Sequence, residues 1–349
     1  MRSAVLSGPG KPLEIVEREV PEPGPGEILV RVTACGMCFS EVNHLRGHYP
    51  FGTFPAVPGH EISGVVAALG EGVAWPEVGT PVGTGWVYGS CGTCDQCVRG
   101  DQILCTGAPK RVTGVNTDGG YAEYFVGSAG FVTPLPDGLD PVAGAPLMCA
   151  GITAFNGLRH AGTAAGSKVA VLGTGGVGTM ALRFATAMGA RVAVVSRSRR
   201  AEKEALDAGA EVFVATQEQD PAEALRAWGG ADVVANTAPD TGTGLAAFGG
   251  LRPDGTLLYL GMGAENVSVP PGGARLEPAA GDGRAVRLTA RPARHARLRE
   301  GARHRPRGDA RHPGRRPAPP RRDGRGHPPG PRGHHLRANV RRCHGRAFS

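Results

Sequence analysis

Four cysteines in the segment CGTCDQCVRGDQILC have a spacing that suits metal binding. They are Cys91, Cys94, Cys97 and Cys105, in a C-x2-C-x2-C-x7-C pattern. Two-residue gaps let successive thiolates converge on one ion, and a thiolate from beyond the turn completes a tetrahedron. The pattern predicts a structural zinc site, with an iron–sulfur cluster or a redox-active thiol set as the alternatives.

A second motif, VLGTGGVG, has the spacing G-x-G-x-x-G and follows an apolar run at 168–173. It contains Gly173, Gly175, Gly176, Val177 and Gly178. The first glycine of such a motif makes a tight turn, the second admits a pyrophosphate close to backbone N–H groups, and the third lets a helix approach a strand. The motif therefore predicts a dinucleotide-binding turn, although a glycine-rich turn without a ligand is the alternative interpretation.

The residues that follow the next apolar run, 191–196, bear on which nucleotide is bound. The acid that would bond the adenosine ribose is absent, and the run ends in Ser196 with Arg197 and Arg200 close behind. A serine removes the carboxylate that would repel a 2′-phosphate, and guanidinium groups bind phosphate bidentately. The pattern favours NADP over NAD, unless the arginines form only a solvated cluster at the strand end.

The elements that must hold these motifs change in kind along the chain. Short β-branched runs at 28–33, 61–69 and 121–126, cut by Gly and Pro, predict a small antiparallel β domain. From residue 168, strands alternate with helical patterns. The expected strands are 168–173, 191–196, 211–215, 231–237 and 256–261, with helices after the first two. Repeated βα units predict an α/β fold with a doubly wound parallel sheet.

Composition separates the last part of these 349 residues from the rest. Residues 275–349 contain 21 Arg, no Lys and 5 acidic residues, whereas residues 1–274 hold 18 basic and 26 acidic ones. The tail has only seven Val, Leu, Ile, Met or Phe residues, too few to offset the chain entropy lost on folding. We expect an acidic, enzyme-like body followed by a disordered tail.

No run of eighteen apolar residues occurs, and the N-terminal segment lacks the apolar core of a signal peptide. We therefore expect a cytoplasmic protein that does not enter a membrane. Because cytosolic thiols stay reduced, its eight cysteines are interpreted as metal ligands or buried thiols before disulfides. Cys35 is expected to be a buried thiol.

Several further motifs occur in a familiar order: ACGMCFSE, GHE, the four-cysteine loop, GGYAEY, PLMCAGITAF and GTGGVG. Together they resemble the zinc-dependent alcohol dehydrogenases of the medium-chain dehydrogenase/reductase superfamily, with the cinnamyl-alcohol and primary-alcohol branch as the nearest group. The resemblance covers residues 1 to about 270. It implies a GroES-like catalytic domain at 1–150 and a Rossmann nucleotide-binding domain at 151–272. That second domain would be incomplete, with an atypical Arg/Pro/Gly-rich tail at 273–349.

The resemblance also implies a catalytic zinc ion held by Cys38, His60 and Cys149, and hence two zinc ions per chain. Three soft or borderline ligands leave a fourth position open, as a catalytic zinc ion needs. Glu61 is similar to the family's acid near the metal, which acts as a supporting group or transient ligand. Glu41 replaces the usual Asp that orients the metal-bound histidine.

The family resemblance assigns roles to four more residues. Ser40 matches the hydroxyl that bonds the alcohol and starts a proton relay, and Thr153 matches a residue close to the nicotinamide. Tyr49 and Trp86 stand where the family has bulky walls of the substrate pocket, with core packing as the alternative role.

Two positions depart from the family pattern. The relay histidine is replaced by Asn43, with His44 next to it, so proton release is expected to pass through water. Phe39 replaces the usual His or Arg after the first ligand, which removes one charged contact with the pyrophosphate.

Together these features imply hydride transfer between NADP(H), or alternatively NAD(H), and a small primary alcohol or aldehyde. A homodimer or homotetramer is expected of the family. One alternative is a catalytically impaired dehydrogenase, because the tail replaces the last part of the nucleotide sheet. The other is nucleic-acid binding through the arginine-rich tail, which its lack of Lys and its single aromatic residue, Phe348, disfavour.

The composition of the tail also predicts that residues from about 275 onward are an out-of-frame reading of the coding DNA. Arg, Pro, Gly, Ala and His, whose codons are GC-rich, dominate there, while Ile, Lys and Tyr are absent. We expect trypsin to remove the tail quickly. Resequencing of the gene and an intact mass of the native protein test the hypothesis. A confirmed frame and a mass for all 349 residues, together with alcohol dehydrogenase turnover, would refute it.

Overall fold

The computed structural model describes residues 1–261, 274–278 and 286–290, and in the last two segments it describes the backbone only. These residues belong to one unit, Met1–His295. The tail from 291 onward, with its expected disorder and reading frame, lies outside the described residues, as do 262–273 and 279–285.

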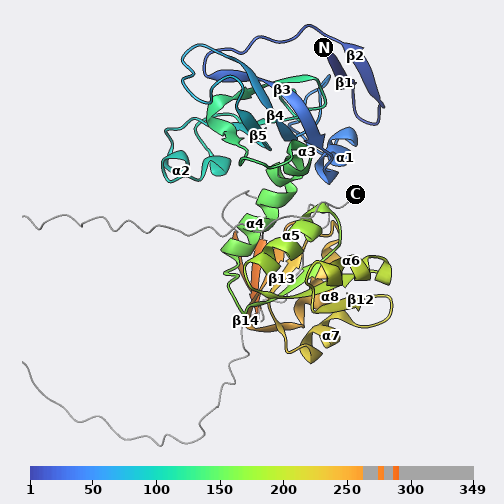
Figure 1. Cartoon of the computed structure of the whole chain (residues 1–349). Coiled ribbons are helices and arrows are strands. Elements are labelled where there is room, and N and C mark those ends of the chain that lie inside the picture. The colour runs from blue at the N-terminus through green and yellow to red at the C-terminus, as the bar shows by residue number, and fades with distance from the viewer. Residues whose placement is uncertain (262–273, 279–285, 291–349) are drawn as a thin grey trace, which may run out of the picture. The chain divides into compact units, whose positions relative to one another are not determined.

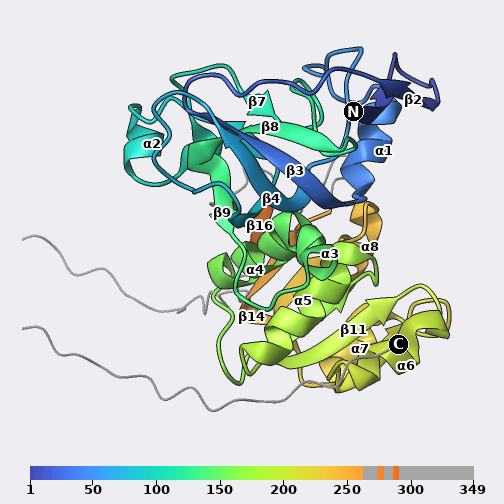
Figure 2. The same ribbon diagram turned by 45° about the horizontal axis from the view of Figure 1, so that its top comes forward.

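The first part of the chain is an antiparallel β region, as the sequence predicts. Its five-stranded sheet has the order β8-β3-β4-β5-β9, and Figure 2 labels β8, β3, β4 and β9. The strands are β3 (Glu27–Gly36), β4 (Glu61–Leu69), β5 (Pro81–Thr84), β8 (Tyr124–Ser128) and β9 (Val132–Pro134). Two small ribbons pair β1 (Arg2–Leu6) with β2 (Leu13–Glu17), and β6 (Val87–Gly89) with β7 (Arg111–Val112). Alternate residues of β3 and β4, among them Ile28, Val30, Ile62 and Val66, form the core.

Short helices connect these strands and carry the chemical motifs. Helix α1 (Phe39–Leu45) follows β3, and α2 (Asp95–Val98) lies within the four-cysteine loop. The helices α3 (Pro141–Gly144) and η3 (Ala145–Met148) lead into α4 (Ala150–His160). The candidate metal-binding residues Cys38, His60 and Cys149 therefore lie at the ends of strands and helices.

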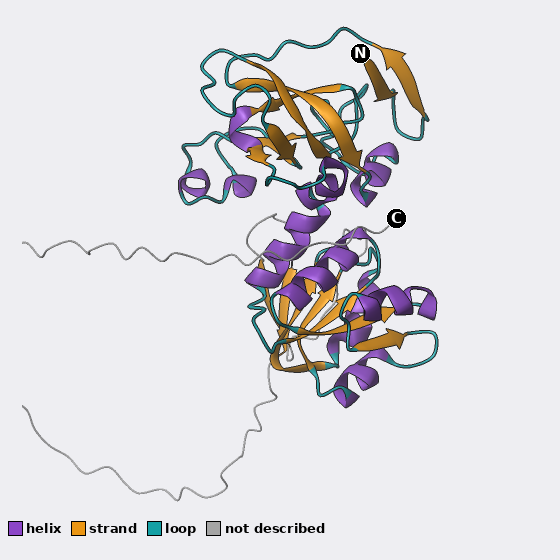
Figure 3. Cartoon of the chain, in the orientation of Figure 1, coloured by secondary structure: helices purple, strands orange, loops and turns teal. Residues whose placement is uncertain are grey.

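The second part is a parallel sheet flanked by helices (Figures 1 and 3). Its strands are β10 (Lys168–Leu172), β11 (Arg191–Ser196), β12 (Val212–Ala215), β13 (Ala231–Asn236) and β14 (Leu251–Tyr259). Its helices are α5 (Gly176–Ala187), α6 (Glu202–Asp207), α7 (Pro221–Ala227) and α8 (Thr241–Phe248). The strand order is β12-β11-β10-β13-β14, so the chain adds strands first on one side of β10 and then on the other. Doubly wound folds bind ligands at such a switch point, here between β10 and β13.

Strand β10 is buried on both faces, which explains its continuous apolar sequence. Val169 and Val171 pack into one core with α4, α5 and α6. Ala170 and Leu172 pack into the opposite core with α7 and α8. Helices α7 and α8 begin at side-chain caps, because Asp220 accepts from the Glu223 N–H and Asp240 from the N–H groups of Gly242 and Thr243.

The sheet differs from the sequence prediction at its last strands. Strand β14 begins at Leu251, five residues before the predicted start, with Asp254 at a φ of 63° near an irregularity in its pairing with β13. Beyond it, β16 (Val286–Ala290) pairs antiparallel with β14, and β15 (Ala274–Pro278) pairs with β16. Two strands thus lie within the range that we expected to be a tail from residue 273 onward.

The glycine-rich turn connects β10 to α5 as predicted. Gly173 has a φ of 99°, in the left-handed region that favours glycine. A Cβ on Gly178 would collide with the carbonyl oxygen of Gly173, so this glycine allows the helix to approach the strand. A Cβ on Gly175 would meet no atom within 4 Å, so open space lies beside this backbone at the beginning of α5.

Within the described ranges, no single helix is both long and apolar enough to cross a membrane. One bent pair, Pro141–Met148 with Ala150–His160, passes the same test by length and composition alone.

The different surroundings of the two glycines predict opposite effects of the same substitution. Gly178→Ala should lower the free energy of unfolding by about 1–3 kcal/mol, because the new methyl group must displace backbone. Gly175→Ala should leave it nearly unchanged, since its φ of −77° suits alanine and the space is open. Urea denaturation of both variants measures this difference, and equal effects would contradict the described packing of α5 against β10.

Candidate functional site

Three side chains from distant segments meet at one point in the β region. Cys38 precedes α1, His60 precedes β4, and Cys149 precedes α4. Their potential ligand atoms all lie within 4.8 Å of one another. The structure therefore brings together the three residues that the sequence analysis assigns to a catalytic zinc ion.

The geometry of this cluster fits a tetrahedral metal ion. The Sγ atoms of Cys38 and Cys149 are 3.9 Å apart, much farther than in a disulfide. Zinc–sulfur bonds of about 2.3 Å at tetrahedral angles would place two sulfurs about 3.8 Å apart. His60 is 1% exposed, and its buried Nε2 has no hydrogen-bond partner among the described residues. Two sulfurs and an unpartnered imidazole nitrogen form a suitable donor set for zinc.

Glu41 links two of these residues. Its Oε1 lies 2.5 Å from Nδ1 of His60, and its Oε2 accepts a 2.7 Å hydrogen bond from the backbone N–H of Cys38. A proton on Nδ1 leaves the Nε2 lone pair free for a metal, as in many metal-bound histidines. Burial lowers the pKa of His60, but contacts with Cys38 and Glu41 outweigh it and raise the pKa to about 9.

Glu61 is a second buried carboxylate, 3% exposed, and it bonds to the backbone next to Cys149. Its Oε1 accepts from the backbone N–H of Ala150, which directly follows Cys149. Burial, together with the charge of Cys38, raises the pKa of Glu61 to about 7. Gly36 makes room for it, because a Cβ there would collide with Oε2 of Glu61. Sequence reasoning missed both Gly36 and the Ala150 N–H.

Ser40 and two aromatic residues surround the cluster. The Ser40 hydroxyl is buried and lies 3.6 Å from Sγ of Cys38. The Trp86 ring stands edge-on to His60, with centroids 4.9 Å apart, and Tyr49 lies 5.7 Å from Trp86. Ser40 and Trp86 thus lie beside the candidate metal-binding residues, and Tyr49 packs behind Trp86.

The structure also describes the surroundings of the two positions that depart from the family pattern. Asn43 is buried, while Phe39 is 49% exposed. His44 stacks on Phe54, with ring centroids 4.8 Å apart, and neither of its ring nitrogens has a hydrogen-bond partner within the described part of the chain. Burial lowers the pKa of His44.

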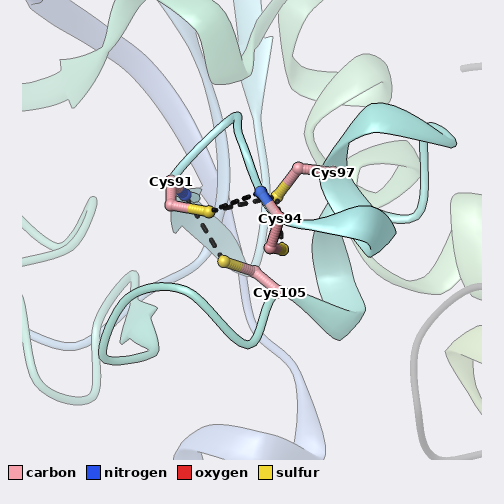
Figure 4. A group of neighbouring side chains, drawn as sticks. All are labelled: Cys91, Cys94, Cys97 and Cys105. Carbon is pink, nitrogen blue, oxygen red and sulfur yellow. Dashed lines mark hydrogen bonds between the residues drawn. The ribbon is translucent and has the colours of Figure 1, made fainter.

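The four cysteines of the loop form a separate cluster, in which their sulfur atoms point toward a common centre (Figure 4). Sγ of Cys97 lies 3.8 Å from Sγ of Cys91 and 3.6 Å from Sγ of Cys94. Backbone N–H groups surround the sulfurs: those of Thr93 and Cys94 donate to Cys91, and that of Cys91 donates to Cys105. Such bonds lower the pKa of Cys91 to about 7 and of Cys94 to about 5. These separations favour a single ion bound by four thiolates.

The predicted nucleotide residues lie at the carboxyl ends of neighbouring strands and at nearby helix ends. Thr153 is in the first turn of α4, and a Cβ on Gly176 would lie 3.8 Å from Ala150 of the same turn. Ser196 ends β11, which pairs with β10 just before the glycine-rich turn. This arrangement places the predicted nucleotide site next to the segment that carries Cys149.

The arginines after β11 divide into two groups. Arg199 bonds Glu202 at 2.6 Å and Glu218 at 2.9 Å, so acids occupy its guanidinium group. Arg197 and Arg200 are exposed and form no ion pair with other described residues. The two arginines that the sequence analysis selected are therefore the ones available to an anion.

Comparison with known proteins connects this geometry to a family. Residues 24–137 match the alcohol dehydrogenase GroES-like domain, and residues 176–290 match the zinc-binding dehydrogenase family. The second match continues beyond residue 270, where we expected the resemblance to end. An alcohol dehydrogenase of Geobacillus stearothermophilus is 37% identical over 273 residues, which cover 77% of this chain and 80% of the relative.

Two solved structures have the same fold. A zinc-binding dehydrogenase of Sinorhizobium meliloti bound to NADP has a TM-score of 0.71 and 32% identity, covering 77% of this chain and 80% of its own. A cobalt- and zinc-bound thermostable alcohol dehydrogenase of Pyrobaculum aerophilum has a TM-score of 0.68 and 32% identity, covering 77% and 79%. These matches confirm the expected GroES-like region followed by a Rossmann sheet.

Proposed function

This chain belongs to the zinc-dependent alcohol dehydrogenases of the medium-chain dehydrogenase/reductase superfamily, and we propose that it transfers a hydride between NADP(H) and a primary alcohol or aldehyde. The observation that carries the proposal is the convergence of Cys38, His60 and Cys149 beside the first turn of α4, a helix that packs against α5, the helix that begins at the glycine-rich turn. An oxidoreductase of this family needs its substrate oxygen and its nicotinamide to be held close together.

In this proposal the chain holds two zinc ions. Cys38, His60 and Cys149 would hold a catalytic ion, with Glu61 beside it, and the four loop cysteines would hold a structural ion. Zinc at the first site would act as a Lewis acid on the substrate oxygen. Glu41 keeps His60 in the tautomer that binds metal, and Glu61 fixes the backbone next to Cys149.

Ser40 is the proposed proton acceptor for an alcohol substrate. Its buried hydroxyl lies beside Cys38 and therefore within reach of the substrate oxygen. Asn43 occupies the next relay position and cannot carry a proton as histidine does, so the proton would continue through water. Tyr49 and Trp86 would exclude bulk water on one side of the substrate and favour an apolar or aromatic alcohol.

The proposed nucleotide is NADP, with NAD as the alternative. Backbone N–H groups at the beginning of α5 would bind the pyrophosphate in the open space beside Gly175, and Thr153 would lie near the nicotinamide. Ser196 contributes no negative charge, and Arg197 and Arg200 would bind the 2′-phosphate. The NADP in the Sinorhizobium meliloti structure supports this choice.

The remaining expectations stay predictions. They are a cytoplasmic location and a homodimer or homotetramer. The two alternatives, an impaired dehydrogenase and a nucleic-acid-binding protein, rest on the tail, which lies outside the described residues.

The two metal sites predict a zinc content of about two ions per chain. Cys94→Ser should release the structural ion and lower the melting temperature, because metal binding contributes to folding. Cys149→Ala should lose the other ion and abolish turnover while it keeps the fold. Elemental analysis, circular dichroism and alcohol oxidation assays measure these effects. The control Cys35→Ala should retain both ions, and one zinc ion or none in active wild-type protein would contradict the assignment.

The sequence after β11 predicts the preference between the two nucleotides. Wild-type protein should have a higher kcat/KM with NADPH than with NADH. Ser196→Asp should reverse the order, shifting the ratio about tenfold or more, because a carboxylate would face the 2′-phosphate. The control Ser167→Asp places the same charge just before β10 begins, at the opposite edge of the sheet from Ser196, and should leave the ratio unchanged. Equal efficiencies with both nucleotides in the wild type would rule out the preference.

A further inference from the structure

A pocket of about 200 Å³ lies between β6, β7 and residues 102–110, which include the end of the four-cysteine loop. Its walls include Phe51, Trp86, Ile103 and Ala108, which offer aromatic and aliphatic surface. An apolar cavity of roughly 150 Å³ can bind benzene. The pocket is therefore large enough for one aromatic ring or a short alkyl chain.

The pocket shares aromatic residues with the surroundings of the candidate metal site. Trp86 belongs to both, since its ring lies 4.9 Å from the ring of His60 and also lines the pocket. Phe51 likewise lines the pocket and lies 5.4 Å from Tyr49, ring centroid to ring centroid. A molecule whose reacting end is at the metal ligands could extend past Trp86 into this space.

The pocket lining contains basic side chains and Cys105, one of the four loop cysteines proposed to bind a metal ion. The basic side chains are those of Lys110 and Arg111, and none of the lining residues is acidic. Arg111 is already engaged, because its guanidinium group lies 3.9 Å above the Tyr88 ring and 3.8 Å from a carboxylate oxygen of Glu27. Lys110 forms no ion pair with any described residue, so it is the cation available to a ligand.

We propose that this pocket is a distal substrate subsite, which binds the far end of an aromatic or medium-length alcohol or aldehyde that carries an anionic group. The apolar walls hold the body of the molecule, and Lys110 pairs with its terminal carboxylate or phosphate. This inference rests on the proposed function, because it names the class of substrate for the same site.

The test compares three benzyl alcohols with different para substituents. They are 4-(hydroxymethyl)benzoate, 4-(hydroxymethyl)phenyl phosphate and the neutral 4-methylbenzyl alcohol, assayed with zinc-loaded full-length protein. At low salt, at least one anionic substrate should have a kcat/KM about fivefold or more above that of the neutral one. The preference should weaken at high salt, because ions screen an exposed charge pair. The two anionic compounds show whether carboxylate or phosphate is preferred.

Substitution of the lysine isolates the charge. Lys110→Met keeps a long side chain and should remove the preference, mainly through KM, while leaving kcat/KM for 4-methylbenzyl alcohol nearly unchanged. Lys11→Met makes the same change in the net charge of the protein, in the turn between β1 and β2, and should keep the preference. A preference that is absent in the wild type, or that persists in Lys110→Met, overturns the proposal.

Filling the pocket tests its location separately. Ala108→Trp should reduce kcat/KM for the para-substituted alcohols much more than for ethanol, which is too short to pass Trp86. An equal loss for both classes would mean that the pocket is not a distal subsite.

Binding measurements distinguish this inference from the proposed function. Calorimetry of 4-(hydroxymethyl)benzoate with wild type and Lys110→Met reports on the pocket even if no alcohol is turned over. Absence of turnover with every alcohol and either nucleotide would refute the proposed function. Equal affinity of the two proteins for the benzoate would refute the subsite alone.

Discussion

The arrangement of Cys38, His60 and Cys149, the candidate metal site, depends on the carboxylate of Glu41. It is 5% exposed, and one oxygen contacts Nδ1 of His60 while the other accepts from the Cys38 N–H. A buried carboxylate must satisfy its oxygens in this way, because burial of an unpaired charge is costly. The same two bonds set the tautomer of His60 and the position at which α1 begins. They therefore also fix Ser40, which lies in the first turn of that helix.

The charges around this point explain why a cation suits the cluster. Glu41 and Glu61 are both buried. Burial raises the pKa of Cys38, but its hydrogen bond with Cys149 has the larger, opposite effect and lowers that pKa to about 3. The same contact raises the pKa of Cys149 well above its usual value. Of Cys38, His60 and Cys149, only His60 can carry a positive charge, and it does so only when its ring is protonated. A divalent cation would balance the thiolates and carboxylates and would remove the proton that Cys38 and Cys149 share.

How much of the site could be predicted from sequence depends on the distance along the chain between its parts. The cysteine loop and the glycine-rich turn are local, so spacing alone indicates their chemistry. Cys38, His60 and Cys149 are far apart in sequence, and only the family resemblance assigned them to one site. Contacts that depend on backbone atoms or empty space, such as the Ala150 N–H and the room provided by Gly36, leave no readable signal.

The same distinction applies to the sheet and to its flanking charges. Strands with two buried faces, such as β10, were predicted within a residue or two because their apolar runs are continuous. The early start of β14 and the antiparallel pairing of β16 depend on tertiary contacts that no local pattern encodes. The sequence alone also could not show that Arg199 forms ion pairs with Glu202 and Glu218, whereas Arg197 and Arg200 remain available to an anion.

Helix α4 physically connects the metal cluster to the nucleotide sheet. Cys149 stands at its N-terminal end, while Ala154 and Leu158 are fully buried in the core that contains Val169 and Leu258. A Cβ on Gly157 would lie 2.6 Å from Leu260, so the helix packs closely against the residues that end β14. Among the described residues, the packing that positions Cys149 therefore comes from β10 and the end of β14. Strand β14 is in turn paired with β16, so the sheet behind α4 continues into the range that we expected to be a tail.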